Sequence, residues 1–477
     1  MFSVIVFCLF TRPGSSSARE RIKDLSRRNH YTPNGRISIL YFKANPSTYF
    51  STINHLGYDV PMTSICIYED AGWTALRPIT DLRPICTVQL GGASIIDRVQ
   101  LGFPDAQLTL NVRSNLAQFV TELAPKFQIN SSPNVLPLVL LNGRVLVTPS
   151  VIAQIQHALT LTTDTLITFR GDIVALILKT SVSLGHALLD PTLDSKTAAA
   201  RLSPSVTAIE IDHCDILSAP WDLGRLLTTA IADTAARFPL GQTNGHVYPN
   251  VAMYNAAHIF VGSRSSIEDF VVIDAQAGPV IIDDDVIIES HSRIVGPIYI
   301  GCHSQILGGK IRGSSIGPWC KISGEVSSCI FAGYTNKSHD GFWGNSYIGH
   351  WSNIGAGSIT SNLKNTYGSV SLEYEGRRID SGQQFLGAIV GDHVKLGIGS
   401  HLATGTIVGT ASSVFGTAIH DKFIPNLSWG ESGAYDITDI DRLLITTHRI
   451  QARRGVTMSA TEALLLRSIH CDRSAIR

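Results

Sequence analysis

Aliphatic residues recur every six positions through the second half of this 477-residue chain. The runs are Val261, Ile267 and Ile273; Ile282, Ile288, Ile294, Ile300 and Ile306; Ile348 and Ile354; and Val390, Leu396, Leu402, Val408 and Val414. A period of six matches neither the period of about 3.6 residues of an α-helix nor that of about two of a strand. It is typical of a β-helix, whose coils must stack because one coil cannot bury its inner face alone. The spacing therefore predicts a β-helix over residues 245–420.

Two stretches, Gly324–Tyr347 and Thr360–Ala388, interrupt this aliphatic pattern. Insertions in a rod of stacked coils are expected to project as loops, and loops on a rigid scaffold often carry function. Beyond the repeats, Asp436–Arg453 and Ser459–Ile469 have helical patterns, and Ser459 with Glu462 forms a predicted capping box. Residues 421–477 are therefore expected to form a helical cap at the end of the β-helix.

Strands alternate with helices over residues 62–240, which indicates an α/β domain. The expected strands are Ser64–Tyr68, Ala106–Val112, Val135–Leu141, Val145–Val147, Thr165–Arg170 and Ile173–Leu178. The expected helices are Ser114–Leu123, Ser150–Leu159 and Trp221–Phe238, with a further helix fed by the loop within Leu76–Val99. Gly171-Asp172 is a strong signal for a hairpin turn.

Residues 1–61 differ from the rest, because arginine and lysine there clearly outnumber acidic residues. An arginine-rich, acid-poor leader is compatible with a transit peptide. The alternative is that this segment is not part of the working protein, since Met62 stands directly before the first convincing strand. Either way, we expect it to lie outside the folded core.

The composition limits the possible partners. Formal net charge is zero, so no bulk electrostatic attraction to nucleic acid or membranes is expected. The eight cysteines include no C-x-x-C pair, which argues against a zinc site or a disulfide framework and favours the reducing cytoplasm. No apolar segment approaches the roughly 20 residues needed to span a bilayer.

Several longer motifs carry a resemblance to a known family. They are IYED at Ile67–Asp70, LRPITDLRPI at Leu76–Ile85, LLNGRVL at Leu140–Leu146, PWDL at Pro220–Leu223, NKSHDGFWGNSYIG at Asn336–Gly349, NIGAGSITSNLKNTYG at Asn353–Gly368 and FIPNLSWG at Phe423–Gly430. Over about residues 64–470 the chain resembles a sugar nucleotidyltransferase family related to bifunctional N-acetylglucosamine-1-phosphate uridylyltransferase/glucosamine-1-phosphate acetyltransferase. The resemblance implies a left-handed hexapeptide β-helix, transferase activity and a homotrimer.

Nucleotidyl transfer needs cationic donors for a triphosphate and a divalent metal to neutralise charge. In the wider superfamily, a glycine-rich loop with an arginine follows the first strand. Leu76–Pro84 stands in that place without the glycines, and leaves Arg77 and Arg83 as phosphate candidates. Of the two, Arg83 is the candidate catalytic residue, expected to act on the leaving pyrophosphate. Glu69 and Asp70 are candidate Mg²⁺ ligands; alternatively, they are solvated loop charges.

The chain departs from this superfamily at the end of a central strand. A Gly-Asp pair, whose aspartate binds Mg²⁺, is replaced here by Gly143-Arg144. An arginine cannot coordinate the metal. Either Glu69 or Asp70 substitutes, or the domain binds a nucleotide sugar without making it, with Arg144 contacting phosphate. Arg144 is otherwise a surface turn residue.

Acetyl transfer to a sugar amine needs a general base, and histidine suits neutral pH. His339 stands five residues before Gly344 and ten before Gly349, the spacing of the base in the resembled acetyltransferases. The alternative is a hydrogen-bonded structural histidine. Asn362 matches a substrate-contacting asparagine, and Lys364 is a weaker candidate. The following tyrosine is Leu363 here, so the acceptor pocket is only partly kept.

Three functions follow from these residues. The first is a two-domain enzyme that uses sugar phosphates, nucleoside triphosphates with Mg²⁺, and acetyl-CoA. The second is a non-catalytic protein that binds nucleotide sugars, and the third is a trimeric scaffold.

Overall fold

The computed structural model describes residues 63–131 and 134–475. All of these residues lie in one compact unit by their internal contacts. The predicted basic extension, residues 1–61, lies outside the described residues.

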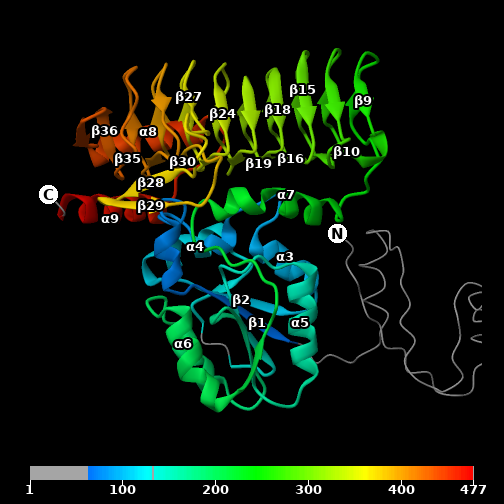
Figure 1. Cartoon of the computed structure of the whole chain (residues 1–477), viewed down its shortest axis with the longest axis vertical. Helices are drawn as coiled ribbons and strands as arrows, with labels where there is room; N and C mark the ends of the chain where they lie inside the picture. Colours follow the sequence, from blue (N-terminus) through cyan, green and yellow to red (C-terminus); the bar gives the residue numbers. More distant parts are fainter. Residues whose placement is uncertain (1–62, 132–133, 476–477) are drawn as a thin grey trace, which may run out of the picture. The chain divides into compact units, whose positions relative to one another are not determined.

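A seven-stranded mixed sheet forms the centre of the N-terminal region (Figure 1). Its strands are β1 (Ser64–Tyr68), β2 (Gln107–Asn111), β3 (Gln128–Ile129), β4 (Leu138–Asn142), β5 (Thr165–Phe169), β6 (Asp172–Leu178) and β7 (Thr207–Glu210), in the order β3-β2-β1-β4-β6-β5-β7. The strands β1 and β4 are parallel neighbours, and β6 runs antiparallel to both β4 and β5. The ends of β1 and β4 therefore meet at the same edge.

Helices of this region have amphipathic sequences and bury their apolar faces. They are α3 (Ile95–Gly102), α4 (Ser114–Leu123), α5 (Pro149–Thr160), α6 (Ser195–Leu202) and α7 (Asp222–Ala235). The predicted helices and the β5–β6 hairpin are confirmed. Val145–Val147 is not a strand, because only Val145 forms an isolated bridge, to Ile216. Helix α6 and strand β7 were not predicted, because the first is alanine-rich, the second is short and neither has a strong periodic pattern.

The second half of the described chain is a parallel β-helix, which confirms the predicted fold class (Figure 1). Its first sheet contains β10 (Ile259–Val261), β13 (Val280–Ile282), β16 (Ile298–Ile300), β19 (Ser315–Ile316), β22 (Ile330–Phe331), β25 (Tyr347–Ile348), β30 (Ile389–Val390), β33 (Ile407–Val408) and β35 (Phe423–Ile424). Its second sheet contains β8 (His246–Val247), β11 (Ser266–Ile267), β14 (Ile287–Ile288), β17 (Gln305–Ile306), β20 (Lys321–Ile322), β23 (Asn336–Lys337), β26 (Asn353–Ile354), β31 (Lys395–Leu396), β34 (Ser413–Val414), β36 (Ser428–Glu431) and β37 (Ala434–Ile437). Its third sheet contains β9 (Ala252–Tyr254), β12 (Val272–Asp274), β15 (Ser292–Val295), β18 (Gly309–Arg312), β21 (Glu325–Ser327) and β24 (Phe342–Gly344), and β27 (Ile359–Thr360) pairs with β32 (His401–Leu402) in later coils. The aliphatic residues that recur every six positions form one buried core inside these coils.

The first predicted interruption is not a projecting loop. Residues 324–347 contain β21, β22, β23 and β24, which continue all three sheets. Phe331, Lys337 and Trp343 take the inward positions there, in register with aliphatic residues of the preceding coil. These three inward residues keep the period of six but are not aliphatic. The aliphatic pattern therefore did not predict this coil.

The second interruption does leave the coil. After β27 the chain forms a hairpin of β28 (Ser371–Tyr374) and β29 (Arg377–Asp380) before it returns at β30. Leu372 is buried, and Tyr374 packs edge-on against Phe423 at 5.1 Å between ring centroids. The base of the hairpin is therefore packed on the later coils.

The α/β region, the outer face of the first β-helix sheet and the C-terminal helices share a hydrophobic core. Those helices are α8 (Ile440–Ala452) and α9 (Ala460–Ala475). The predicted capping box is only half formed: Glu462 N–H donates to Ser459 Oγ, but the Glu462 carboxylate accepts hydrogen bonds from Gln451 instead. Within the described ranges, no helix is both long and apolar enough to cross a membrane.

Two adjacent isoleucines of β14 provide a test of the β-helix core. Ile288 is fully buried, whereas its neighbour Ile287 points outward and is 37% exposed. We expect Ile288→Ala to lower the free energy of unfolding by about 2–5 kcal/mol, because a cavity remains in the coil. Ile287→Ala, measured in the same denaturant titration, is the matched control and should have a much smaller effect. Equal effects would contradict the assigned register.

Candidate active site

An ion pair joins the ends of β1 and β4 in the α/β region. Arg144, which follows β4, donates from Nε and Nη2 to the two carboxylate oxygens of Asp70, both at 2.6 Å. Asn142 also donates to Asp70, at 2.9 Å. Both partners of the ion pair are buried. Gly72 leaves the space for this arrangement, since a Cβ there would lie 2.3 Å from Arg144 Nε.

Glu69 forms a second buried ion pair. Its carboxylate accepts from Arg113 Nη1 at 2.7 Å and from the Arg113 backbone N–H at 2.9 Å. Burial raises the pKa of Glu69, although Arg113 acts in the opposite direction. The Arg113 guanidinium also lies 4.0 Å from the centre of the Trp73 ring. Arg113 is thus a structural partner that the sequence analysis did not identify.

These carboxylates do not fit a Mg²⁺ ion as they are arranged. Mg²⁺ needs several oxygen ligands held around one point in nearly octahedral geometry. The oxygens of Glu69 and Asp70 accept hydrogen bonds from Arg113, Arg144 and Asn142 instead. Among the residues that the structure describes, no group of three or more His, Cys, Asp or Glu side chains could hold a metal ion.

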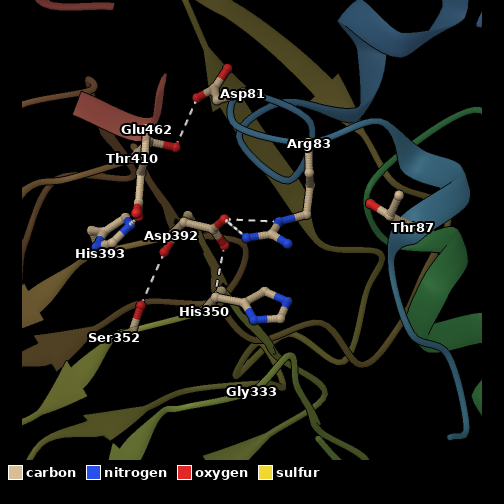
Figure 2. A network of polar contacts seen from close by, with 12 residues as sticks. Asp81, Arg83, Thr87, Gly333, His350, Ser352, Asp392, His393, Thr410 and Glu462 are labelled. Atoms are coloured by element: carbon tan, nitrogen blue, oxygen red, sulfur yellow. Dashed lines mark hydrogen bonds and ion pairs between the residues drawn. The ribbon is translucent and has the colours of Figure 1, made fainter. Parts of the chain in front are cut away.

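Arg83 connects the α/β region with the β-helix (Figure 2). Its Nε and Nη2 donate to one carboxylate oxygen of Asp392 at 2.9 and 2.6 Å, and the His350 backbone N–H donates to the other oxygen at 2.8 Å. Asp392 follows β30 and is 2% exposed. Burial alone would raise the pKa of Asp392, but Arg83 and the nearby imidazoles lower it below its ordinary value. Arg83 is therefore bound to protein groups rather than directed into solvent.

Arg77 is more accessible than the other predicted phosphate ligands. Its side chain is 35% exposed, and its Nε donates to Asp81 at 2.7 Å. Asp81 also accepts from Thr410 and Asn426 of the β-helix, at 2.9 and 2.8 Å. The Leu76–Pro84 loop thus bonds with the β-helix through Asp81 as well as through Arg83.

His339 lies at the corner between β23 and β24, and its side chain is exposed. Its backbone carbonyl accepts a hydrogen bond from the Lys337 ammonium at 2.8 Å. The next residue, Asp340, accepts from Gly357 N–H of the following coil at 3.1 Å. The His339 imidazole is therefore exposed at the surface. It lies on a corner whose backbone carbonyls accept hydrogen bonds from Lys337 and from Gly357 of the following coil.

Asn362 and Lys364 lie at the start of the segment that leads to the hairpin. Asn362 donates to the Asn345 side chain at 2.8 Å, directly after β24. His339 precedes β24, so within one chain the two residues lie near opposite ends of that strand. The Lys364 ammonium donates to the Ser369 carbonyl at 3.0 Å. Among the described residues, no hydrogen bond joins His339 to Asn362 or to Lys364.

Comparison with known proteins confirms the resemblance for the α/β region. Residues 65–242 match the family model described as sugar nucleotidyl transferase. The chain is similar to a bifunctional sugar-1-phosphate nucleotidylyltransferase/acetyltransferase of Sulfurisphaera tokodaii, at 29% identity over 36% of this chain and 43% of that protein. It is also similar to the bifunctional protein GlmU of Methanococcus vannielii, at 35% identity over 22% of this chain and 26% of that protein. The chain spans less than half the length of the curated relatives it matches.

Solved structures of acyltransferases also align with part of the chain. The polySia-specific acetyltransferase NeuO aligns at 16% identity over 45% of this chain and 97% of that chain, with a TM-score of 0.23. The N-acyltransferase AntD of Bacillus cereus aligns at 12% identity over 44% and 89%, with a TM-score of 0.17. These scores are too low for any conclusion about this chain.

The Arg83–Asp392 ion pair provides a test of how the two regions are held together. At pH 7 we expect Asp392→Asn to lower the free energy of unfolding by about 3–5 kcal/mol, because Arg83 is left buried without its counter-ion. A lowered carboxyl pKa stabilises the fold above the unfolded value of about 4, and this contribution is lost as pH falls through the folded value. The difference in the free energy of unfolding between Asp392→Asn and wild type should therefore become smaller at acidic pH.

Asp285→Asn is the matched control for Asp392→Asn. Asp285 pairs with Arg264 on the surface of the β-helix at 2.6 Å, and the Arg264 side chain is 66% exposed. Such pairs are screened by water and salt. Denaturant titrations at pH 7 and pH 3 should show little change for this variant. A similar loss in both variants would contradict a special role of the buried pair.

Proposed function

We propose that this chain is a transferase of sugar-nucleotide metabolism, with a region of the sugar-1-phosphate nucleotidyltransferase type and a β-helix of the acyltransferase type. The match of residues 65–242 to sugar nucleotidyl transferases, followed by a hexapeptide β-helix, carries the proposal. The same two activities stand in the name of the relative from Sulfurisphaera tokodaii. The proposed substrates are sugar phosphates, nucleoside triphosphates and acetyl-CoA.

In the β-helix, His339 is the proposed general base. As an acceptor amine attacks the thioester carbon of acetyl-CoA, a C–N bond forms and the C–S bond breaks. A neutral imidazole takes the proton released by the amine and can return it to the leaving thiolate. Its exposure supports this role, since both substrates have to reach it. Asn362 and Lys364 are proposed to contact the acceptor.

In the α/β region, Arg77 is the proposed phosphate ligand, because its guanidinium is partly open to solvent. Roles for Arg83 and Arg144 in phosphate binding require the ion pairs with Asp392 and Asp70 to open. The engaged carboxylates favour a second candidate for this region alone, namely nucleotide-sugar binding without transfer. In this second candidate, Arg113 and Arg144 neutralise the charges that a metal would otherwise neutralise.

A screen of two reactions tests these proposals. The full chain is incubated with sugar 1-phosphates, nucleoside triphosphates and Mg²⁺ for pyrophosphate release, and with amino-sugar phosphates and acetyl-CoA for thiol release. We expect His339→Ala to lower the rate of acyl transfer by about 10²–10⁴-fold, because a positioned general base contributes a factor of this size. Pyrophosphate release should stay unchanged. Asp340→Asn, the exposed neighbour, is the control.

The outcomes separate the candidates. Thermal stabilisation by nucleotide sugars without pyrophosphate release would favour the binding role of the α/β region, since a ligand bound only to the native state raises stability. Full acyl transfer by His339→Ala would exclude this histidine as the base. Absence of both reactions in wild type would contradict the proposed enzyme.

A homotrimer is proposed as the working assembly. Large apolar side chains are exposed on the later coils, including Ile398 at 75%, Ile419 at 68% and Trp429 at 52%. Exposed apolar residues of this size often mark interfaces, and closed symmetry would cover them in every copy. Light scattering should give about three times the 51.5 kDa chain mass. Ile398→Glu should reduce the measured mass, whereas Ile287→Glu on an earlier coil should leave it unchanged. A monomeric mass for the wild type would contradict the trimer.

A further inference from the structure

Lys337 occupies a position inside the β-helix that other coils of the same sheet fill with aliphatic residues. It lies on β23 in register with Ile322 of β20, and only 1% of its surface is exposed. The inward residues of neighbouring strands in this sheet are Ile306, Ile322 and Ile354. A charged side chain at this point is costly unless its donors are satisfied.

The Lys337 ammonium joins the corners of two successive coils. It donates to the Ser323 carbonyl of one corner and to the His339 carbonyl of the next, both at 2.8 Å. The first corner spans residues 323–324 and the second spans residues 338–341. The backbone ladder between β20 and β23 reaches Ser323, whose N–H donates to the Lys337 carbonyl at 2.8 Å, and the lysine ammonium then serves the Ser323 and His339 carbonyls of these unequal corners.

Gly324 preserves the room for this ammonium. Its φ of +81° lies in the left-handed region that favours glycine, and a Cβ there would stand 3.0 Å from Lys337 Nζ. The opposite side of the His339 corner is bonded through Asp340, whose carbonyl accepts from Gly357 N–H. The two successive peptide groups His339–Asp340 and Asp340–Gly341 are thus each held by a hydrogen bond.

We propose that Lys337 is a positioning residue for acyl transfer, which holds the corner that presents His339. This inference rests on the proposed role of His339 as general base. Burial lowers the pKa of Lys337 to about 8, as expected for an ammonium removed from water. An aliphatic residue fills the same position in adjacent coils, and replacing a buried charge by an apolar residue is often neutral or stabilising. The bonds to the two corners therefore explain the lysine better than coil packing does.

The test compares Lys337→Met with Ile322→Met in the full chain. Methionine keeps the length of lysine and removes its donors, and Ile322→Met places the same side chain one coil earlier. We expect Lys337→Met to lower kcat for acyl transfer by about 10²-fold, because small misplacements of a catalytic group have effects of this size. The KM values for acetyl-CoA and acceptor should stay within about twofold. Ile322→Met should retain wild-type kcat.

A spectroscopic measurement makes the inference independent of the assay. The His339 imidazole resonance is identified in ¹⁵N-histidine spectra as the one missing from His339→Ala. It should shift or broaden in Lys337→Met and stay unchanged in Ile322→Met, while circular dichroism shows both variants folded. An inactive wild type would overturn the proposed function but not this comparison. An unchanged His339 resonance in folded Lys337→Met would overturn the positioning role, and so would unchanged kcat in an active enzyme.

If Lys337→Met does not fold, Lys337→Arg replaces it in both measurements. Arginine keeps donors but places them farther from the main chain. A shifted His339 resonance with reduced kcat then supports the inference, and wild-type values for both contradict it.

Discussion

Pairing of buried carboxylates with arginines is the interaction on which the arrangement of this protein depends. Asp392 follows β30 at a buried turn of the β-helix and cannot remain charged there without a partner, since an isolated buried ion is very unfavourable. Arg83 supplies that partner from the α/β region at 2.6 Å. The apolar residues around it form one core that includes the α/β region, a β-helix face and α9. Hydrophobic burial gives the contact its strength, and the ion pair fixes its register.

The same rule accounts for the end of the α/β sheet. A superfamily that binds a metal at this edge needs free carboxylates, and a free pair would repel without the ion. Here Arg144 stands opposite Asp70, and Arg113 stands opposite Glu69. Arg144, which replaces the expected aspartate, therefore neutralises the charge of Asp70 in the fold. Its consequence for function is that the protein neutralises this edge with its own side chains.

The sequence predicted the architecture because burial imposes a period. Five isoleucines spaced six residues apart, from Ile282 to Ile306, need no tertiary information to indicate stacked coils. The coil of Phe331, Lys337 and Trp343 keeps the same period but has no aliphatic residue at these positions, so the aliphatic pattern does not reveal it. Motifs singled out His339, Arg83 and Arg144, but not Arg113. The partner of Arg83 could not, because 309 residues separate it from Asp392 and no local pattern connects them.

The coil that departs from the aliphatic pattern is also the one that leads to His339. An ideal β-helix repeats its corners, so every backbone N–H meets the carbonyl of the adjacent coil and no corner differs from the next. Here the corner lengthens from residues 323–324 to residues 338–341, and the unmatched carbonyls accept from a buried lysine. The non-aliphatic residues that hide this coil from the repeat pattern therefore include Lys337, whose two hydrogen bonds hold the corner of His339.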